Sequence, residues 1–268
     1  MCPQNSDNSS PPPGSPPATV VITCDVLRDE FMQFARGMDH IVHIEVLKQG
    51  LHNDPPLLRK ELQQAVDRVE NDWPLARAIV LGYGLCSRGV EGVVARRCQV
   101  VLPRAHDCIT LLLGDRQVYA QYVKDHPGTY WYSPGWLRCS LPPGPERHAK
   151  LLADYREKFG PEDADFLMES EQSWFKNYDR AAFVDLGTPD AEKDVEKTRQ
   201  CADWLGWSVD RLHGSPTLLQ DLLLGHWDSQ RFLVLEPGQT AHMTADEQVV
   251  VAIDAKDTDV IQPEKKPT

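Results

Sequence analysis

Short apolar runs that alternate with helical segments are the feature that most limits how this chain can fold. The early runs are Ala18–Cys24, Ile41–Leu47, Ala78–Leu81 and Val100–Leu102. After a long interruption the alternation resumes with Arg180–Leu186, Trp207–Leu212 and Arg231–Leu235. Strands that alternate with helices are typical of parallel sheets whose faces are covered by the crossover helices. We therefore predict an α/β protein, a Rossmann-like three-layer sandwich with a mostly parallel sheet and a helical insertion.

The chain length allows one large α/β domain or two small ones, since it has 268 residues. Residues 1–17 are rich in Pro, Asn and Ser, a composition typical of a disordered tail. We predict a single α/β domain over residues 18–254, with a helical excursion at about 137–178, and a loose C-terminal tail over residues 255–268. Two similar halves that face a shared cleft are also compatible with this order of elements.

The composition argues against several classes of partner. The formal net charge is -12, and no cluster of Lys and Arg interleaves with aromatic residues, so we expect no nucleic-acid partner. No apolar run approaches the roughly 20 residues that span a bilayer, so we expect no membrane partner. The N-terminus has neither a basic start nor an apolar core, which excludes a secretory signal. We therefore expect a cytoplasmic protein whose seven cysteines are reduced.

Three cysteines stand directly after predicted strands. Cys24 ends the first strand, Cys86 follows the third and Cys108 follows the fourth, with His106 close by. The turns after parallel strands lie along one edge of a sheet, so we expect these side chains to share a crevice. Thiolate and imidazole groups are the ligands that zinc prefers. The pattern predicts a metal site, most simply zinc, at Cys24, Cys86, His106 and Cys108.

Two other interpretations of the cysteines remain open. Cys86 could be a catalytic nucleophile with His106 as its base, because a thiol at a helix N-terminus has a lowered pKa. A helix predicted over about Gly89–Arg96 would place Cys86 in that position. Alternatively, the cysteines are small buried hydrophobic residues, as free cysteines commonly are.

Neighbouring residues suggest how a ligand could be held. Gly82 and Gly84 would permit close approach of a ligand to the main chain. Arg104 could hold a carboxylate, and Tyr130 stands in an aromatic loop that could wall a flat ligand or pack on the core. We therefore assign Gly82, Gly84, Arg104 and Tyr130 as candidate cofactor-binding residues.

Two polar residues in these turns have both a functional and a structural interpretation. His52 follows the second strand and could reach the same crevice, although a turn histidine is more often solvated. Asp107 could orient an imidazole. Its position just before a predicted helix favours the role of N-cap.

Several short motifs occur in one order along the chain. They are Gly82–Ser87, Pro103–Ile109, Pro127–Tyr130, Pro134–Trp136 and Pro237–Gly238. In these motifs the chain resembles domain of unknown function family 1638, a family of bacterial and archaeal proteins, from about Ala18 to Thr240. The resemblance implies an association with corrinoid-dependent methyl transfer, and so with one-carbon metabolism. The chain lacks the Asp-x-His-x-x-Gly corrinoid-ligand motif, so we do not expect an ordinary cobalamin carrier.

These observations lead to three functional hypotheses. The first is a metal-binding Cys/His pocket linked to methyl-group metabolism, which as an enzyme would be a metal-dependent transferase or hydrolase. The second is a non-catalytic accessory protein that binds a small molecule or a corrinoid, with a corrinoid methyltransferase as its partner. The third is an enzyme that uses a cysteine nucleophile.

Overall fold

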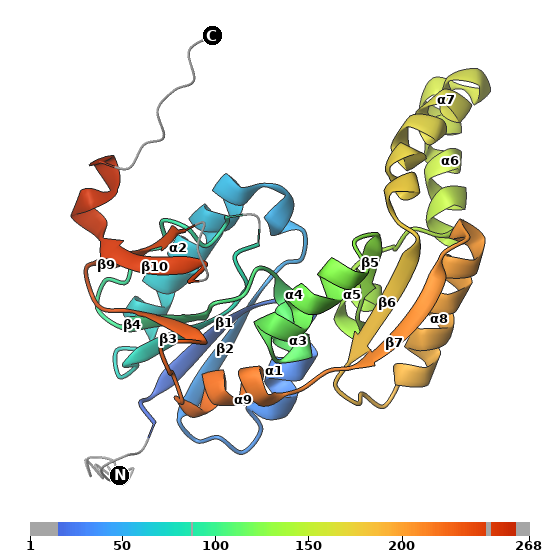
Figure 1. Ribbon diagram of the computed structural model, residues 1–268. Helices are drawn as coiled ribbons and strands as arrows, with labels where there is room; N and C mark the ends of the chain where they lie inside the picture. Colours follow the sequence, from blue (N-terminus) through green and yellow to red (C-terminus); the bar gives the residue numbers. More distant parts are fainter. Residues whose placement is uncertain (1–15, 87, 245–247, 261–268) are drawn as a thin grey trace, which may run out of the picture.

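The larger of two parallel sheets contains most of the early strands. The computed structural model describes residues 16–86, 88–244 and 248–260. The strands of this sheet are β1 (Thr19–Cys24), β2 (Ile41–Leu47), β3 (Ala78–Gly82), β4 (Gln99–Pro103) and β8 (Phe232–Leu235). Their order is β2-β1-β3-β4-β8, and only β8 is antiparallel to its neighbour (Figure 1). The predicted α/β class with a mostly parallel central sheet is confirmed.

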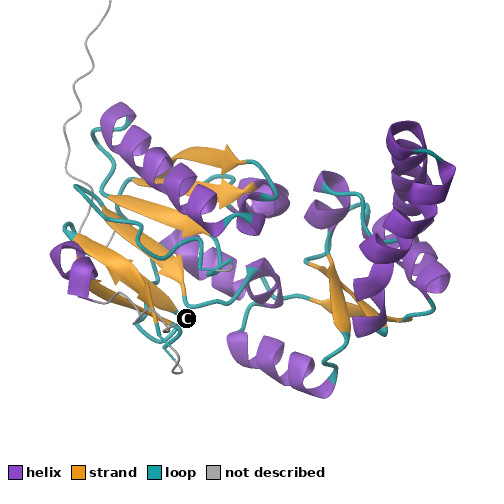
Figure 2. Cartoon of the chain, turned by 90° about the horizontal axis from the view of Figure 1, so that it is seen from above, coloured by secondary structure: helices purple, strands orange, loops and turns teal. Residues whose placement is uncertain are grey.

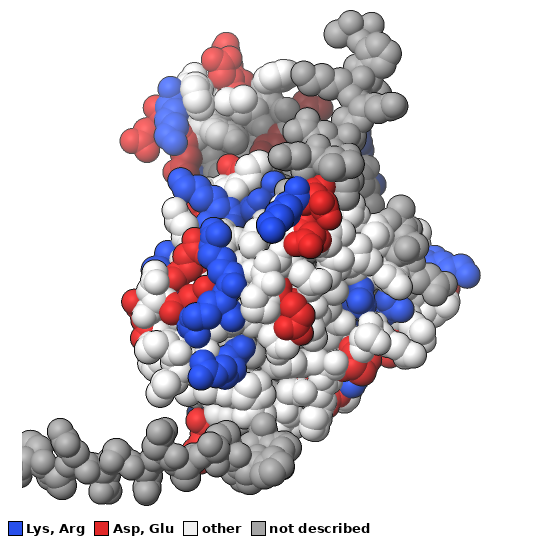
Figure 3. Space-filling view, turned by 90° about the vertical axis from the view of Figure 1, so that its left-hand side faces the viewer, with Lys and Arg blue, Asp and Glu red and all other residues white. Residues whose placement is uncertain are grey.

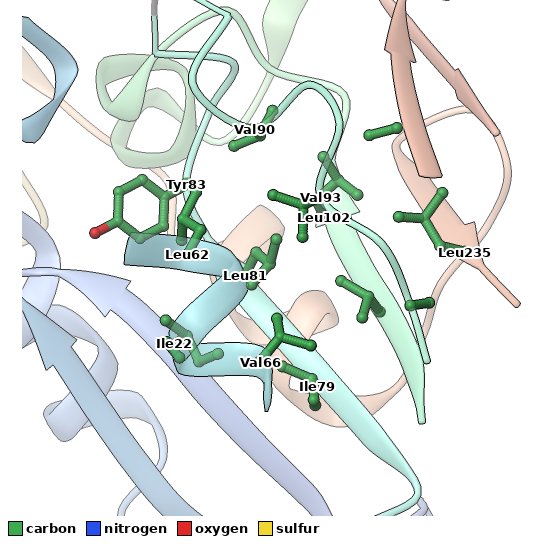
Figure 4. Packing of buried hydrophobic residues seen from close by; sticks show 14 of the residues in the cluster. Ile22, Leu62, Val66, Ile79, Leu81, Tyr83, Val90, Val93, Leu102 and Leu235 are labelled. Carbon is green, nitrogen blue, oxygen red and sulfur yellow. The ribbon is translucent and has the colours of Figure 1, made fainter. Parts of the chain in front are cut away.

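Helices pack on both faces of the larger sheet. One face carries α2 (Pro55–Asp72), whose apolar side chains meet Val20 and Ile22 of β1 in a core that Figure 4 shows in part. The other face carries α1 (Arg28–Phe34), α3 (Cys108–Leu113) and α9 (Thr217–Leu224), which meet Val21. Side chains in a strand alternate between faces, so an uninterrupted apolar run fits a strand that is covered on both sides.

The second sheet is smaller and entirely parallel. It contains β5 (Thr129–Tyr132), β6 (Arg180–Asp185) and β7 (Ser208–His213) in that order. The helices α5 (Pro134–Cys139) and α8 (Ala191–Leu205) supply side chains to the core on one of its faces. Figure 2 shows the two sheets as separate bodies joined by short connections.

One continuous sheet, which the strand order predicted, does not form. The predicted strands at 180–186 and 207–212 pair with β5 instead of extending the larger sheet. The reason lies at 129–132, where the aromatic stretch, interpreted as a loop or short strand, forms the edge strand that pairs with β6. The predicted strands are thus divided between two sheets of different size.

The remaining elements connect or extend the sheets. The helix α4 (Arg116–Asp125) leads to β5, and α6 (Pro145–Phe159) and α7 (Pro161–Gln172) form a hairpin within the predicted excursion that projects from the second sheet (Figure 1). Late in the chain, β9 (Gln239–Met243) and β10 (Val250–Asp254) form an antiparallel hairpin. The short 3₁₀ helices are η1 (Asp25–Leu27), η2 (Leu51–Asn53), η3 (Ser173–Asn177) and η4 (Ala255–Val260).

Several predicted features lie at or beyond the limits of the described residues. Most of the predicted N-terminal tail, residues 1–15, and residues 261–268 of the C-terminal tail are outside them. Over the described part of the chain, no helix combines the length and apolar character needed to cross a membrane. The face of the molecule in Figure 3 carries basic and acidic side chains next to one another.

The two sheets are held together by a contact between α5 and the start of the first helical segment. A Cβ atom on Gly135 would lie 1.7 Å from the carbonyl oxygen of Val26, so only glycine allows this approach. Arg138 strengthens the contact, since its guanidinium lies 3.0 Å from a carboxylate oxygen of Asp25 and 3.0 Å from one of Asp29. The position of α5, and with it the aromatic residues nearby, therefore depends on close main-chain packing.

We predict that Gly135→Ala destabilises the protein by more than about 3 kcal/mol, because main-chain atoms on both sides must move to admit the methyl group. Urea unfolding followed by circular dichroism measures this. Gly128→Ala is the matched control, because the added methyl group there would meet mainly the Asp179 side chain, which can rotate. Equal midpoints for the two variants would contradict the packing argument.

Candidate functional site

A cavity of about 270 Å³ lies where the carboxyl ends of the larger sheet face the second sheet. Every parallel strand of the larger sheet contributes to it through the turn that follows. Cys24 ends β1, His52 follows β2, Cys86 follows β3 and Cys108 follows β4. Because β2 and β3 lie on opposite sides of β1, the boundary between β1 and β3 is a topological switch point, the usual place for a ligand in such sheets.

The structure brings together the three cysteines that the sequence predicted to share a crevice. All three line the cavity, as do the predicted Gly82 and Tyr130. His52 also lines it. The larger sheet therefore supplies thiols at one wall.

The other predicted residues lie elsewhere. His106 is exposed and is not part of the cavity wall, and its main-chain carbonyl oxygen accepts the Cys86 N–H at 3.2 Å. The Arg104 guanidinium donates to the main-chain oxygens of Ser229, Gln248 and Val250, and so ties β4 to the C-terminal hairpin. Neither side chain is placed to act on a molecule in the cavity.

Gly84 allows the turns after β3 and β4 to pack closely and does not line the cavity. A Cβ atom on it would lie 2.6 Å from the Cα of Asp107. Beside it, the N–H of Leu85 donates to the oxygen of Ala105 at 2.8 Å. Gly84 is buried and outside the cavity wall, whereas Gly82 reaches the wall and packs against Phe31.

Cys86 has an unusual backbone. Its φ is +43°, in the left-handed region that residues other than glycine rarely adopt. The helix predicted over Gly89–Arg96 does not form, and turns with an isolated bridge between Val94 and Thr240 take its place. Cys86 is therefore not at a helix N-terminus, and the helix dipole that would lower its pKa is absent at this position.

Asp107 is the N-cap of α3, as its position predicted. Its Oδ1 accepts the N–H of Thr110 at 3.1 Å, and its Oδ2 accepts the hydroxyl of Tyr119 at 2.7 Å. These bonds fix the turn that carries Cys108. Asp107 also lines the cavity, with both carboxylate oxygens already engaged.

The second sheet supplies an aromatic wall that the sequence showed only in part. Trp131, Trp136 and Tyr178 line the cavity together with Tyr130. The interpretation of the aromatic stretch as a wall for a ligand included Trp131 and Trp136. Tyr178 stands at the end of the predicted helical excursion and carried no signal. Tyr83 was also missed, although its place between two glycines directly after a strand was a usable signal.

The environment keeps the thiols protonated. Burial, and then the neighbouring Asp107, Cys86 and Cys24, raise the pKa of Cys108 well above its usual value. Burial and the nearby Cys24 raise the pKa of Cys86 to about 12, and burial is also the main cause of the raised pKa of Cys24. Burial lowers the pKa of His52, which favours the neutral imidazole. The cavity therefore holds neutral thiols at physiological pH.

No metal centre is formed by the side chains as they stand. Among the described residues, no group of three or more His, Cys, Asp or Glu side chains is arranged to hold a metal ion. The predicted set also loses His106, which lies outside the wall.

We predict that the rate at which iodoacetamide alkylates Cys86 keeps rising with pH up to pH 10, because its thiolate fraction grows while the pH is below a pKa of about 12. Mass spectrometry of the Cys86 peptide gives the rate. In urea the rate for the same peptide should be half-maximal near the ordinary thiol pKa of about 8.5 and level off above it. A plateau below pH 8 in the folded protein would instead reveal an activated nucleophile.

Comparison with known proteins agrees with the resemblance found in the motifs. A family model described as "Protein of unknown function (DUF1638)" matches residues 46–223, more than half of the chain. The match includes Cys86, Cys108 and the aromatic wall, and begins after Cys24, so it is shorter than the range from Ala18 to Thr240. Neither the curated proteins nor the solved structures contain a match. The chain therefore belongs to the DUF1638 family.

Proposed function

We propose that this protein binds a small, largely apolar molecule in the cavity between the two sheets. One observation supports the proposal above all. Residues at the ends of all four parallel strands of the larger sheet line the same cavity as the aromatic residues of the second sheet. Ligand sites in proteins are mostly apolar concavities with a few polar groups, placed at such strand ends or between packed units.

The size of the cavity narrows the class of ligand. Its volume of about 270 Å³ is near the lower end of the range of roughly 300–1,000 Å³ that is usual for ligand pockets. A whole corrinoid is larger than such a space. A link to corrinoid-dependent methyl transfer would therefore run through a small substrate or through contact with a corrinoid protein.

The chemistry of the wall favours binding over nucleophilic catalysis. A cysteine nucleophile reacts as the thiolate and needs a base or a positive neighbour. Burial raises the pKa of Cys86 instead, and His106 is not placed to remove its proton. Asp107, which also lines the cavity, is occupied as an N-cap.

A screen of small aromatic and aliphatic compounds tests the proposal. A compound that binds the folded state at 100 times its Kd stabilises the protein by about 2.7 kcal/mol, which a thermal-shift assay detects. We predict that stabilising compounds also slow the reaction of Cys108 with N-ethylmaleimide by at least tenfold, because they fill the space in front of the thiol.

Cys139 is the internal control for this experiment, since it is half-buried and does not line the cavity. Its labelling rate should not change. The proposal would be lost if no compound both stabilised the protein and protected Cys108, or if Cys139 were protected to the same degree.

A soft metal ion is the second candidate ligand. The observation in its favour is that three thiols line one cavity and lie close enough to raise one another's pKa. A cation placed among them would reverse that effect, because a metal lowers the pKa of a coordinating thiol. Zinc, the metal that the sequence suggested, would then be held by Cys24, Cys86 and Cys108 and a fourth group.

We predict for this candidate that protein purified without chelator carries about one zinc ion per chain, a ratio that metal analysis measures. Cys86→Ser should lose the metal because it removes a ligand. Cys98→Ser is the control, since Cys98 is buried in the core and does not line the cavity. Metal-free protein that fails to take up added zinc would eliminate the candidate.

A further inference from the structure

We infer that the small molecule carries a carboxylate, which accepts hydrogen bonds from the Tyr83 hydroxyl and the Trp136 indole N–H. The inference rests on the proposed function, because it assigns the polar end of the molecule that the same cavity would bind. Both residues line the cavity, and neither donor has a partner of good hydrogen-bond geometry among the described residues. One comes from the larger sheet and the other from α5.

Tyr83 is the stronger of the two observations. Its side chain is only 3% exposed, yet its hydroxyl has no partner of good hydrogen-bond geometry, and its neighbour is the weakly accepting sulfur of Cys24. Figure 4 shows its ring at the border of the hydrophobic core with the hydroxyl pointing away from the labelled apolar side chains. Burial and the neighbouring Cys24 raise its pKa well above the usual value, so the hydroxyl stays protonated and remains a donor. A buried donor without an acceptor is costly and rare in folded proteins.

Trp136 offers a second donor from the opposite wall. Its indole Nε1 is buried without a partner of good hydrogen-bond geometry, and the neighbouring acceptor is the Tyr130 hydroxyl. An indole N–H can only donate, so nothing but an acceptor can satisfy it. Its backbone is held in place, because its N–H donates to the Ser133 side chain at 3.2 Å.

The charges around the cavity favour an anionic acceptor. Lys48 lines the cavity and makes no ion pair with a described residue. Among the described residues that line the cavity, Asp107 is the acidic one. Its carboxylate oxygens already accept hydrogen bonds from the Thr110 N–H and the Tyr119 hydroxyl. The thiols are neutral and do not repel an anion. Two donors and a lysine match the two oxygens and the charge of a carboxylate.

A cation in the aromatic wall fits less well. A cation-binding cage needs open ring faces around the ligand. Tyr130 stacks on Trp174 with 5.9 Å between ring centroids, and Trp131 stacks on Tyr119 at 5.7 Å. One face of each of these rings is therefore already covered.

Matched pairs of small probes test the inference. We would titrate the full chain with three carboxylates and with the neutral compound that carries a methyl group in place of each carboxylate. The pairs are benzoate and toluene, phenylacetate and ethylbenzene, and hexanoate and hexane. Ligand-observed NMR measures the binding of each probe. Benzylamine supplies the cationic arm. We expect at least one carboxylate to bind more than tenfold more tightly than its neutral counterpart and than benzylamine.

Tyr83→Phe should weaken that carboxylate by roughly tenfold to a hundredfold, as expected for the loss of one hydrogen bond to a charged group, and should leave the neutral probe unchanged. Tyr178→Phe makes the same chemical change at a wall tyrosine whose hydroxyl is not a buried donor without a partner, and should have little effect. Trp136→Phe removes the second donor, and it serves as an independent variant if Tyr83→Phe does not fold.

The outcomes separate the inference from the proposed function. Equal binding of carboxylates and neutral counterparts, with no effect of Tyr83→Phe or Trp136→Phe, would overturn the carboxylate while leaving a small-molecule site. Preferential binding of benzylamine would also overturn it. No binding by any probe would remove both proposals.

Discussion

The main-chain contact between the turns after β3 and β4 is the constraint on which the site depends. Gly84 lies directly against the backbone of Asp107, and the Leu85 N–H donates to the Ala105 oxygen at 2.8 Å. This contact brings Cys86 to the wall that Cys108 occupies, and it accompanies the left-handed backbone of Cys86. A strained residue persists only where its surroundings determine its conformation, and such residues cluster at functional sites. The turn is therefore an arrangement that packing imposes.

A second main-chain contact closes the cavity from the other side. Gly135 lets α5 approach Val26, and Arg138 pairs with Asp25 and Asp29 beside it. The segment that receives α5 directly follows β1 and Cys24, so one short stretch of chain both carries a thiol and anchors the aromatic wall. The thiol side and the aromatic side of the cavity are thus coupled through the backbone, which gives a pre-formed site rather than one assembled by flexible side chains.

The sequence predicted the local elements and the meeting of the cysteines, because both follow from periodicity and from the rule that parallel strands end at one edge. It did not predict that β6 and β7 leave the larger sheet. That outcome depends on pairing between Tyr130 and Ala181, which are far apart in the chain and are separated by α5, α6, α7 and η3. His106 illustrates a second limit. The neighbouring Ala105 and Asp107 both contact the turn after β3, whereas the His106 side chain between them is exposed to solvent. The residue type alone does not reveal this orientation.

The protonation state of the three thiols determines whether this cavity suits a metal ion or a carboxylate. A metal ion needs thiolates, so its binding releases protons and leaves a negatively charged wall around a cation. A carboxylate needs the opposite, since thiolates would repel it while protonated thiols do not. Burial and the neighbouring acid both favour the protonated state in the metal-free protein. The Tyr83 hydroxyl and Trp136 indole are likewise donors that a bare cation could not satisfy. Protonated thiols and two donors on one wall therefore match a ligand that carries an acceptor, whereas a metal would first have to displace the thiol protons.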